Sequence, residues 1–201
     1  DYSKAREWYE KAAKQGDAGA QCNLGAMYGQ GQGVKQDYSK AREWHEKAAK
    51  QGHADAQHHL GVMYYQGQGG KQDYSKAREW YEKAAKQGDA GAQCNLGAMY
   101  GQGQGVKQDY SKAREWLEKA AKQGDAEAQA NLGVIYKKGQ GVKQDYSKSR
   151  EWYEKSAKQG LAKAQFNLGG MYFNGHGVKK HYYNQSYSYE NAAKKGYEED
   201  H

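Results

Sequence analysis

The sequence predicts an all-α fold, an α-solenoid in which a helix pair of 36 residues repeats along the chain. Residues 1–36 and 73–108 are identical, so a block of two repeats has been copied. Leu24-Gly25 recurs at the same spacing in every later unit. The five tryptophans also recur at this spacing, at Trp8, Trp44, Trp80, Trp116 and Trp152. Each repeat is one unit that buries its apolar face against its neighbours, which gives a single elongated domain.

The first helix of each unit is predicted from apolar spacing. In residues 17–52, Asp17 suits an N-cap and Gly31 and Gly33 suit the end of the helix, because Gly tolerates a left-handed backbone. The apolar side chains fall on one helical face at Ala20, Leu24, Met27 and Tyr28. The N-cap position of the next unit carries His53, which we interpret as a capping variant.

The second helix follows Asp37 as its N-cap and ends at Gly52. We expect its inner face to be Tyr38, Ala41, Trp44, Ala48 and Ala49. On its outer face, side chains of opposite charge stand four residues apart, for example Arg42 and Glu46. Gly25, in the middle of the first helix, costs about 1 kcal/mol relative to Ala, so we expect a neighbouring helix backbone to approach it closely.

The repeat phase divides the chain. Residues 1–16 are a second helix without its first-helix partner, and the face formed by Tyr2, Ala5, Trp8 and Tyr9 is expected to be partly open, which would favour an end-to-end homodimer. The last unit replaces apolar and charged residues by polar ones, as in a capping repeat. The predicted segments are 1–16, then the five repeats 17–52, 53–88, 89–124, 125–160 and 161–196, and a tail at 197–201.

Composition limits the function classes. The net charge of +7 is spread along the chain, since five basic side chains alternate with four acidic ones in residues 73–108, which argues against nucleic-acid binding. No apolar run is long enough to insert in a membrane. Cys22 and Cys94 hold the same position two repeats apart, too far for a disulfide, and are expected to be free apolar fillers. No cofactor is predicted.

The repeated strings resemble the Sel1-like repeat family, a relative of the tetratricopeptide repeat. The matching motifs are A-x-A-Q-x-x-L-G-x-x-Y, G-x-G-V and D-Y-x-K-A-x-x-W-Y-x-K-A-A, in register over residues 1–196. Departures are few and are Gly70, Ser149, Ser156, His181 and Ser188. The resemblance implies a right-handed superhelix with the first helices on its concave wall, and a non-enzymatic role in assembling protein complexes. It also implies a bacterial envelope, signalling or host-interaction factor, in a periplasmic or secreted location in preference to the cytoplasm.

Comparison of the units within the chain separates packing positions from surface positions, because packing residues must repeat. The positions that change in the first helices, 19, 22, 26 and 29 and their equivalents, form one stripe opposite Leu24. Amide side chains beside this stripe could bond an extended peptide backbone, so we predict a groove for a protein or peptide partner. The candidate ligand-binding residues are Asn23, Gln30, Asp55, His58, His59, Tyr65, Gln66, Asn95, Gln102, Glu127, Asn131, Lys137, Lys138, Lys163, Phe166, Asn167, Phe173 and Asn174.

Three alternatives remain open at this stage. The stripe could be an exposed surface that varies without a ligand. Asp55 and His59 share a helical face at a spacing that can hold a metal, but the pattern occurs in one repeat only, and we predict no metal site. Some bacterial relatives bind or weakly hydrolyse β-lactams, so binding or hydrolysis of β-lactams or peptidoglycan fragments is the alternative function. The chain lacks the S-x-x-K, S-D-N and K-T-G motifs of acylating enzymes, and we predict no catalytic residue.

Overall fold

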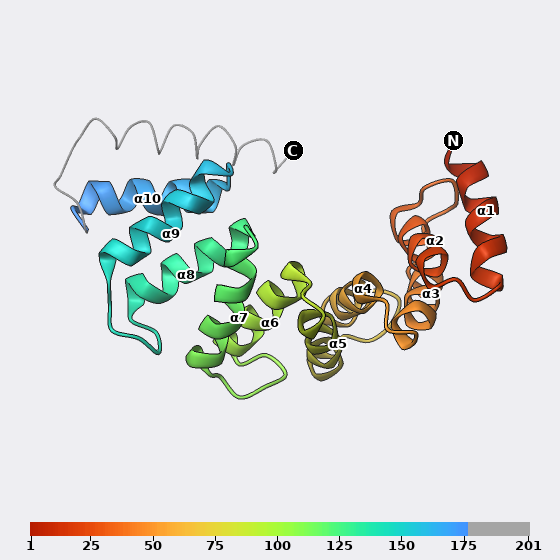
Figure 1. The fold of residues 1–201 in the computed structure, drawn as a ribbon, viewed down its shortest axis with the longest axis horizontal. Coiled ribbons are helices and arrows are strands. Elements are labelled where there is room, and N and C mark those ends of the chain that lie inside the picture. The colour runs from red at the N-terminus through yellow and green to blue at the C-terminus, as the bar shows by residue number, and fades with distance from the viewer. Residues whose placement is uncertain (177–201) are drawn as a thin grey trace. The chain divides into compact units, whose positions relative to one another are not determined.

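The computed structural model describes residues 1–176. Within that range every regular element is an α-helix of 13 residues, and neighbouring helices pack as antiparallel pairs (Figure 1). The helices are α1 (Tyr2–Lys14), α2 (Ala18–Gln30), α3 (Tyr38–Lys50), α4 (Ala54–Gln66), α5 (Tyr74–Lys86), α6 (Ala90–Gln102), α7 (Tyr110–Lys122), α8 (Ala126–Lys138), α9 (Tyr146–Lys158) and α10 (Ala162–Asn174). The predicted all-α solenoid is confirmed. The polar capping features predicted after residue 180, and the tail, lie outside the described residues.

The chain divides into two compact units. The N-terminal unit comprises residues 1–99 and 103–107, and the C-terminal unit comprises residues 100–102 and those from 108 onward. In the N-terminal unit α2 packs on α1 and α3, and α4 packs on α3 and α5. In the C-terminal unit α8 packs on α7 and α9, and α10 packs on α9. We call α2, α4, α6, α8 and α10 the A helices and the odd-numbered helices the B helices.

Capping side chains fix where the helices begin. The Asp17 carboxylate accepts a hydrogen bond from the backbone N–H of Ala20 at 2.6 Å, and the predicted capping variant His53 accepts one from Ala56 through Nδ1 at 3.4 Å. Each A helix ends at a glycine in the left-handed conformation, with φ of 70° at Gly31. These caps satisfy backbone groups that a helix end leaves without partners. The repeat length therefore follows from local chemistry.

The core consists mainly of leucine and alanine. Leu24 and its equivalents in the next three A helices are fully buried, and Ala48 of α3 is fully buried opposite them. Small B-helix residues let the two helices of a pair approach closely, which is the packing predicted for Ala41, Ala48 and Ala49.

The inner face of the B helices differs from the prediction at two aromatic positions. Tyr38 is exposed and Trp44 is only half-buried, whereas His45, one position later, is 3% exposed. The equivalents of His45 are Tyr81, Leu117 and Tyr153, which are also buried. The tryptophan ring instead lies under a lysine, since Lys47 Nζ is 4.1 Å from the Trp44 ring centroid. The periodicity alone could not separate two adjacent large side chains at the edge of the apolar face.

The repeated glycine inside each A helix packs against this buried ring. A Cβ added at Gly61 would lie 2.6 Å from carbons of the Tyr81 ring, and one at Gly25 would lie 2.8 Å from the His45 ring. The predicted close approach is therefore real, but the approaching group is a B-helix side chain and not a helix backbone. Any larger residue would clash with that ring, which outweighs the helix propensity that Gly forfeits.

A buried glutamine in each A helix ties three consecutive helices together. Gln57 donates a hydrogen bond from Nε2 to the carbonyl of Ala49 at 3.1 Å and accepts one at Oε1 from Gln87 at 2.8 Å. Gln21 and Gln129 make the same pair of contacts. Because buried amides left without partners are costly, these bonds fix the register between neighbouring repeats.

Candidate binding face of the A helices

The predicted groove residues all lie on A helices, and none of them is buried. In the N-terminal unit, Asn23, Gln30, Asp55, His59 and Gln66 are exposed. In the C-terminal unit, Gln102, Glu127, Lys138, Lys163, Phe166, Phe173 and Asn174 are exposed. The remaining candidates, His58, Tyr65, Asn95, Asn131, Lys137 and Asn167, are partly exposed. We call this surface the A-helix face, taken separately for each unit.

The predicted stripe is narrower than expected, because one of its positions packs inside the solenoid. Cys22, Cys94 and Ala130, which hold the second position of the stripe, are buried. His58 shows why, since a Cβ added at Gly91 of the next A helix would lie 2.5 Å from its ring. This position contacts the following A helix and not solvent. The exposed part of the face is formed by the amide positions of Asn23 and Gln30 and by positions 19 and 29.

His58 is held in a polar contact between two repeats. Its Nδ1 lies 3.3 Å from the Asp89 carboxylate, and Asn95 Nδ2 lies 3.2 Å from its Nε2. Because the amide nitrogen of Asn95 is a donor, His58 Nε2 accepts its hydrogen bond. His58 Nδ1 therefore carries the ring proton and donates a hydrogen bond to the Asp89 carboxylate. The His58 ring also stacks on His59, with centroids 5.8 Å apart. His58 therefore connects α4 to α6 and is not a free ligand-binding group.

His45 and His59 form a second histidine pair, with ring centroids 5.0 Å apart. Burial is the main cause that lowers the pKa of His45 to about 3, and the neighbouring His59 and His53 add to it. Burial, with His58 beside it, also lowers the pKa of His59. Both rings are uncharged near neutral pH. In the part of the chain that the structure describes, no group of three or more His, Cys, Asp or Glu side chains could hold a metal ion.

A cavity of about 190 Å³ lies between α2, α3 and α4. His45 and Ala41 line it from α3, and His59, Val62 and Met63 line it from α4. The α2 helix contributes Gly25, Ala26, Gly29 and Gln30, the start of α3 contributes Tyr38, and the loop after α4 contributes Gln68. The sequence did not predict this cavity, because the apolar spacing did not place His45 on the inner face.

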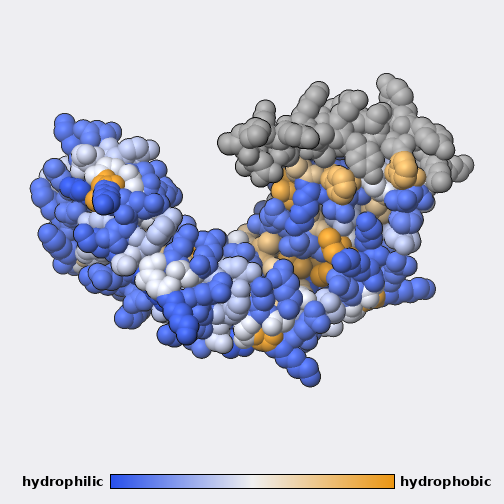
Figure 2. Space-filling view, turned by 180° about the vertical axis from the view of Figure 1, so that it is seen from behind, coloured by the Kyte–Doolittle hydropathy of each residue, from blue (hydrophilic) through white to orange (hydrophobic). Residues whose placement is uncertain are grey.

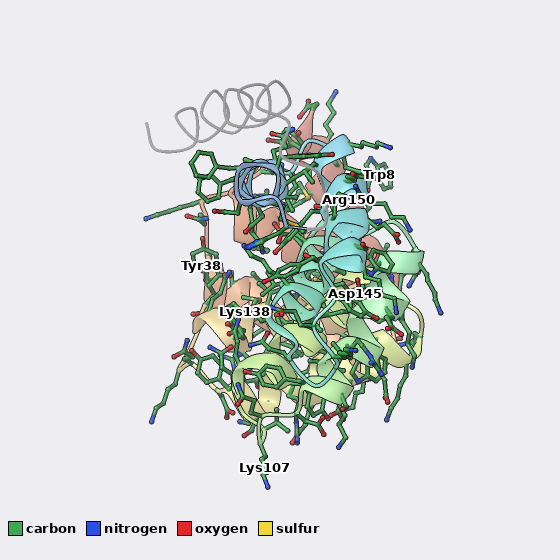
Figure 3. All side chains as sticks on the ribbon, turned by 90° about the vertical axis from the view of Figure 1, so that its left-hand side faces the viewer. Trp8, Tyr38, Lys107, Lys138, Asp145 and Arg150 are labelled. Atoms are coloured by element: carbon green, nitrogen blue, oxygen red, sulfur yellow. The ribbon has the colours of Figure 1, made fainter. Side chains whose placement is uncertain are left out.

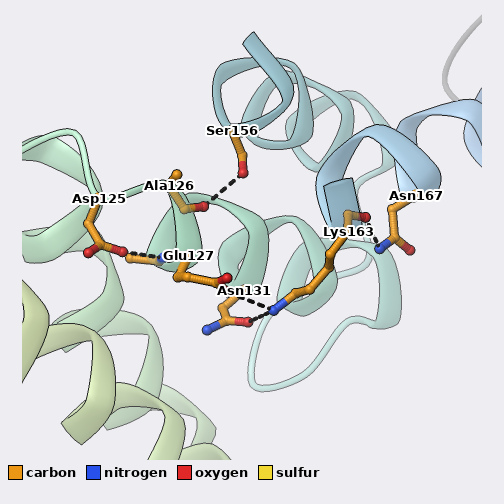
Figure 4. A network of polar contacts seen from close by, with 8 residues as sticks. Asp125, Ala126, Glu127, Asn131, Ser156, Lys163 and Asn167 are labelled. Carbon is orange, nitrogen blue, oxygen red and sulfur yellow. Dashed lines mark hydrogen bonds and ion pairs between the residues drawn. The ribbon is translucent and has the colours of Figure 1, made fainter. Parts of the chain in front are cut away.

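The A-helix face of the C-terminal unit carries a different set of groups. Lys163 Nζ lies 3.0 Å from the Glu127 carboxylate and donates to Asn131 Oδ1 at 3.2 Å, which links α10 to α8 (Figure 4). Phe166 and Phe173 of α10 are 59% and 57% exposed. The space-filling view shows a mainly hydrophilic surface with several hydrophobic areas on the unit that carries α10 (Figure 2).

Two serines and two cysteines of the described residues are buried. Ser149 and Ser156, which replace alanine, are buried and donate hydrogen bonds of 2.8 Å to the carbonyls of Gly133 and Ala126. Cys22 and Cys94 are buried and form no disulfide, as predicted. Burial first, and the Asp55 carboxylate second, raise the pKa of the Cys22 thiol to about 11, so the reactive thiolate is not populated at neutral pH.

The α1 helix exposes aromatic side chains. Trp8 is 68% exposed with Lys11 Nζ 4.2 Å from its ring centroid, and Tyr2 is 59% exposed. Figure 3 shows Trp8 directed away from the helices. The expected open face is present, while the end-to-end homodimer stays a prediction that analytical ultracentrifugation would test. None of the described helices is long and apolar enough to span a membrane.

Comparison with known proteins supports the repeat assignment. A family model for the Sel1 repeat matches residues 1–17, 18–53, 54–89, 90–125, 126–161 and 162–197. No curated protein matches the chain. Among solved structures, c5321, a protective antigen present in uropathogenic Escherichia coli strains, is 40% identical with a TM-score of 0.90. The match covers 98% of this chain and 42% of the antigen, so the chain spans less than half of that relative.

Two further solved structures are similar over nearly the whole chain. A Sel1 repeat protein from Oxalobacter formigenes is 36% identical with a TM-score of 0.90, and the match covers 97% of this chain and 80% of that protein. A Sel1 repeat protein from Klebsiella pneumoniae subsp. pneumoniae is 26% identical with a TM-score of 0.63, over 96% of this chain and 94% of that protein.

Proposed function

Because the chain belongs to the Sel1 repeat family, whose members are scaffolds for protein interactions and are generally non-catalytic, we propose that it binds an extended peptide segment of a partner along the A-helix face. Solenoids use extended surfaces of this kind for binding. The E. coli relative is described as a protective antigen, which supports an envelope or host-interaction role for the proposed complex.

The observation that carries the proposal is the pair of unused amides at Gln30 and Gln66 in the N-terminal unit. They stand 36 residues apart, are exposed, and make no hydrogen bond to the described residues. Other glutamines of the repeat are used internally. Gln36 and Gln72, for example, each donate a 2.7 Å hydrogen bond to the carbonyl of the penultimate residue of the preceding A helix. Each free amide offers a donor and an acceptor, which matches what a peptide backbone requires.

A selection experiment tests the proposal. Peptides would be selected from a random library on the purified chain, and their dissociation constants measured by calorimetry. Replacing these two glutamines with alanine should weaken the selected peptides at least about fivefold, because two hydrogen bonds of about 0.5–1.5 kcal/mol each are lost. The matched control replaces two exposed B-helix residues in the same unit, Glu43 and Glu79, and should leave affinity unchanged. Equal effects of both double variants would contradict the proposal.

For the hydrolase alternative, Ser149 and Ser156 are unsuited to act as the nucleophile, since both are buried and bonded to main-chain carbonyls. A nitrocefin assay at high protein concentration discriminates between the two classes. The scaffold proposal expects no turnover above the rate of the protein-free buffer.

A further inference from the structure

The cavity between α2, α3 and α4 exists because two positions carry smaller residues than their equivalents one repeat later. Gly29 stands where the next repeat has Tyr65, and His45 stands where it has Tyr81. Both small residues line the cavity. The two repeats share their backbone phase and their caps, so the next repeat shows how a tyrosine occupies the corresponding space.

In that next repeat, the Tyr65 ring packs on Tyr74 with centroids 5.1 Å apart and an interplanar angle of 61°. Its hydroxyl donates a 2.8 Å hydrogen bond to the side-chain oxygen of Gln104. The equivalents of these two partners, 36 residues earlier, are Tyr38 and Gln68, and both line the cavity. The two residue types that contact the Tyr65 phenol are therefore also present one repeat earlier, where they line the cavity in place of contacting a tyrosine of the chain.

The chemistry of the walls selects an uncharged aromatic group. No Asp, Glu, Lys or Arg lines the cavity. His45 is 3% exposed, and its Nδ1 is buried without a hydrogen-bond partner. The volume of about 190 Å³ exceeds that of an apolar cavity of roughly 150 Å³ that holds benzene. Glycine at position 29 leaves room for a flat ring beside the helix backbone, since a Cβ there would meet only the Ala41 Cβ at 3.7 Å.

We propose that this cavity binds the phenol side chain of a tyrosine in the partner peptide, with its ring against Tyr38 and its hydroxyl donating to Gln68. This inference rests on the proposed function, since it identifies the side chain that anchors the peptide on the N-terminal unit. The tyrosine would complete the repeat as Tyr65 completes the next one.

The test uses N-acetyltyrosinamide as the probe, followed by NMR on the full chain. Saturable shifts are expected at the His45 and His59 rings and at the Gln68 side-chain amide. Gly29→Tyr should abolish them, because it fills the cavity with the chain's own phenol. The variant should fold, since a Cβ at Gly29 meets only the Ala41 Cβ at 3.7 Å. Glu43→Tyr is the control, because it adds the same side chain at an exposed position of α3, outside the lining.

The hydroxyl contact has its own test. Gln68→Leu should weaken N-acetyltyrosinamide at least threefold and leave N-acetylphenylalaninamide unchanged, because only the phenol uses the amide oxygen. The inference is overturned if wild-type protein shows no saturable shift, if Gly29→Tyr responds like wild type, or if N-acetylleucinamide binds as well as the tyrosine probe. The double variant of Gln30 and Gln66 tests peptide binding separately. Library peptides that depend on those glutamines but are indifferent to Gly29→Tyr would refute the anchor while leaving the scaffold intact.

Discussion

Acidification should destabilise the N-terminal unit through His45. This side chain is 3% exposed, and burial is the main cause that lowers its pKa from 6.5 to about 3, with His59 and His53 as smaller contributions. In the unfolded chain the same imidazole titrates at its ordinary pKa. Between these two values the unfolded state binds more protons than the folded state, so stability is complete above about pH 6.5 and is lost as the pH falls.

The magnitude follows from the unfolded-state titration. At about pH 5, roughly 1.5 pH units below the ordinary histidine pKa, His45 is still neutral in the folded state but protonated in the unfolded state. The free energy of unfolding is therefore about 2 kcal/mol lower than at neutral pH. His45→Tyr restores the residue found at the equivalent positions 81 and 153 and removes this loss. Carboxylates and histidines away from position 45 are present in both proteins, so their contributions cancel when the two free energies of unfolding are subtracted.

The assay is urea unfolding of wild type and His45→Tyr at about pH 7 and about pH 5, with the free energy of unfolding compared at each pH. Wild type should lose about 2 kcal/mol more than the variant on acidification. A loss of the same size in both proteins would refute the reasoning, because it would place the acid sensitivity in other groups.

Three substitutions test the packing and the surface pairs, each by chemical denaturation. Gly61→Ala should destabilise the protein by about 1–3 kcal/mol, because its Cβ would clash with the Tyr81 ring. Gly29→Ala should stabilise it by up to about 1 kcal/mol through helix propensity alone. Changes of the same sign in both variants would contradict the packing described for Gly61. Gln57→Ala should cost about 1–3 kcal/mol, since it removes the hydrogen bonds to the Ala49 carbonyl and from the Gln87 amide, and a neutral result would exclude a structural role. Lys163→Ala should change stability by less than about 1 kcal/mol, because its ion pair is exposed, and a larger loss would show that this estimate is wrong.

The repeat period made most of the fold predictable. Caps, left-handed glycines and apolar spacing are local signals, and the buried leucines and alanines follow from them. The sequence predicted that a neighbouring group lies close to Gly25, but it did not predict which group. The ring of His45 fills that space. Whether His45 or the adjacent Trp44 is buried depends on how α3 is rotated against α2.

The exposure of the A-helix face could be predicted from the sequence except at one position of the stripe, which is buried at Cys22, Cys94 and Ala130. Comparing the repeats distinguishes packing positions from surface positions only where every packing position must carry the same residue. Cys22, His58 and Ala130 vary although they pack between neighbouring A helices, because each meets a different partner. The cavity was also beyond the sequence, since it depends on two small residues, Gly29 and His45, that stand on different helices and meet only in the folded repeat.

The most direct test of a peptide-binding A-helix face is an NMR titration of the labelled chain with a library-selected peptide. We expect the side-chain amide signals of Gln30 and Gln66 in the N-terminal unit to shift and saturate together, while those of the buried Gln57 and Gln129 do not move. Shifts confined to the outer surface of the B helices would contradict it.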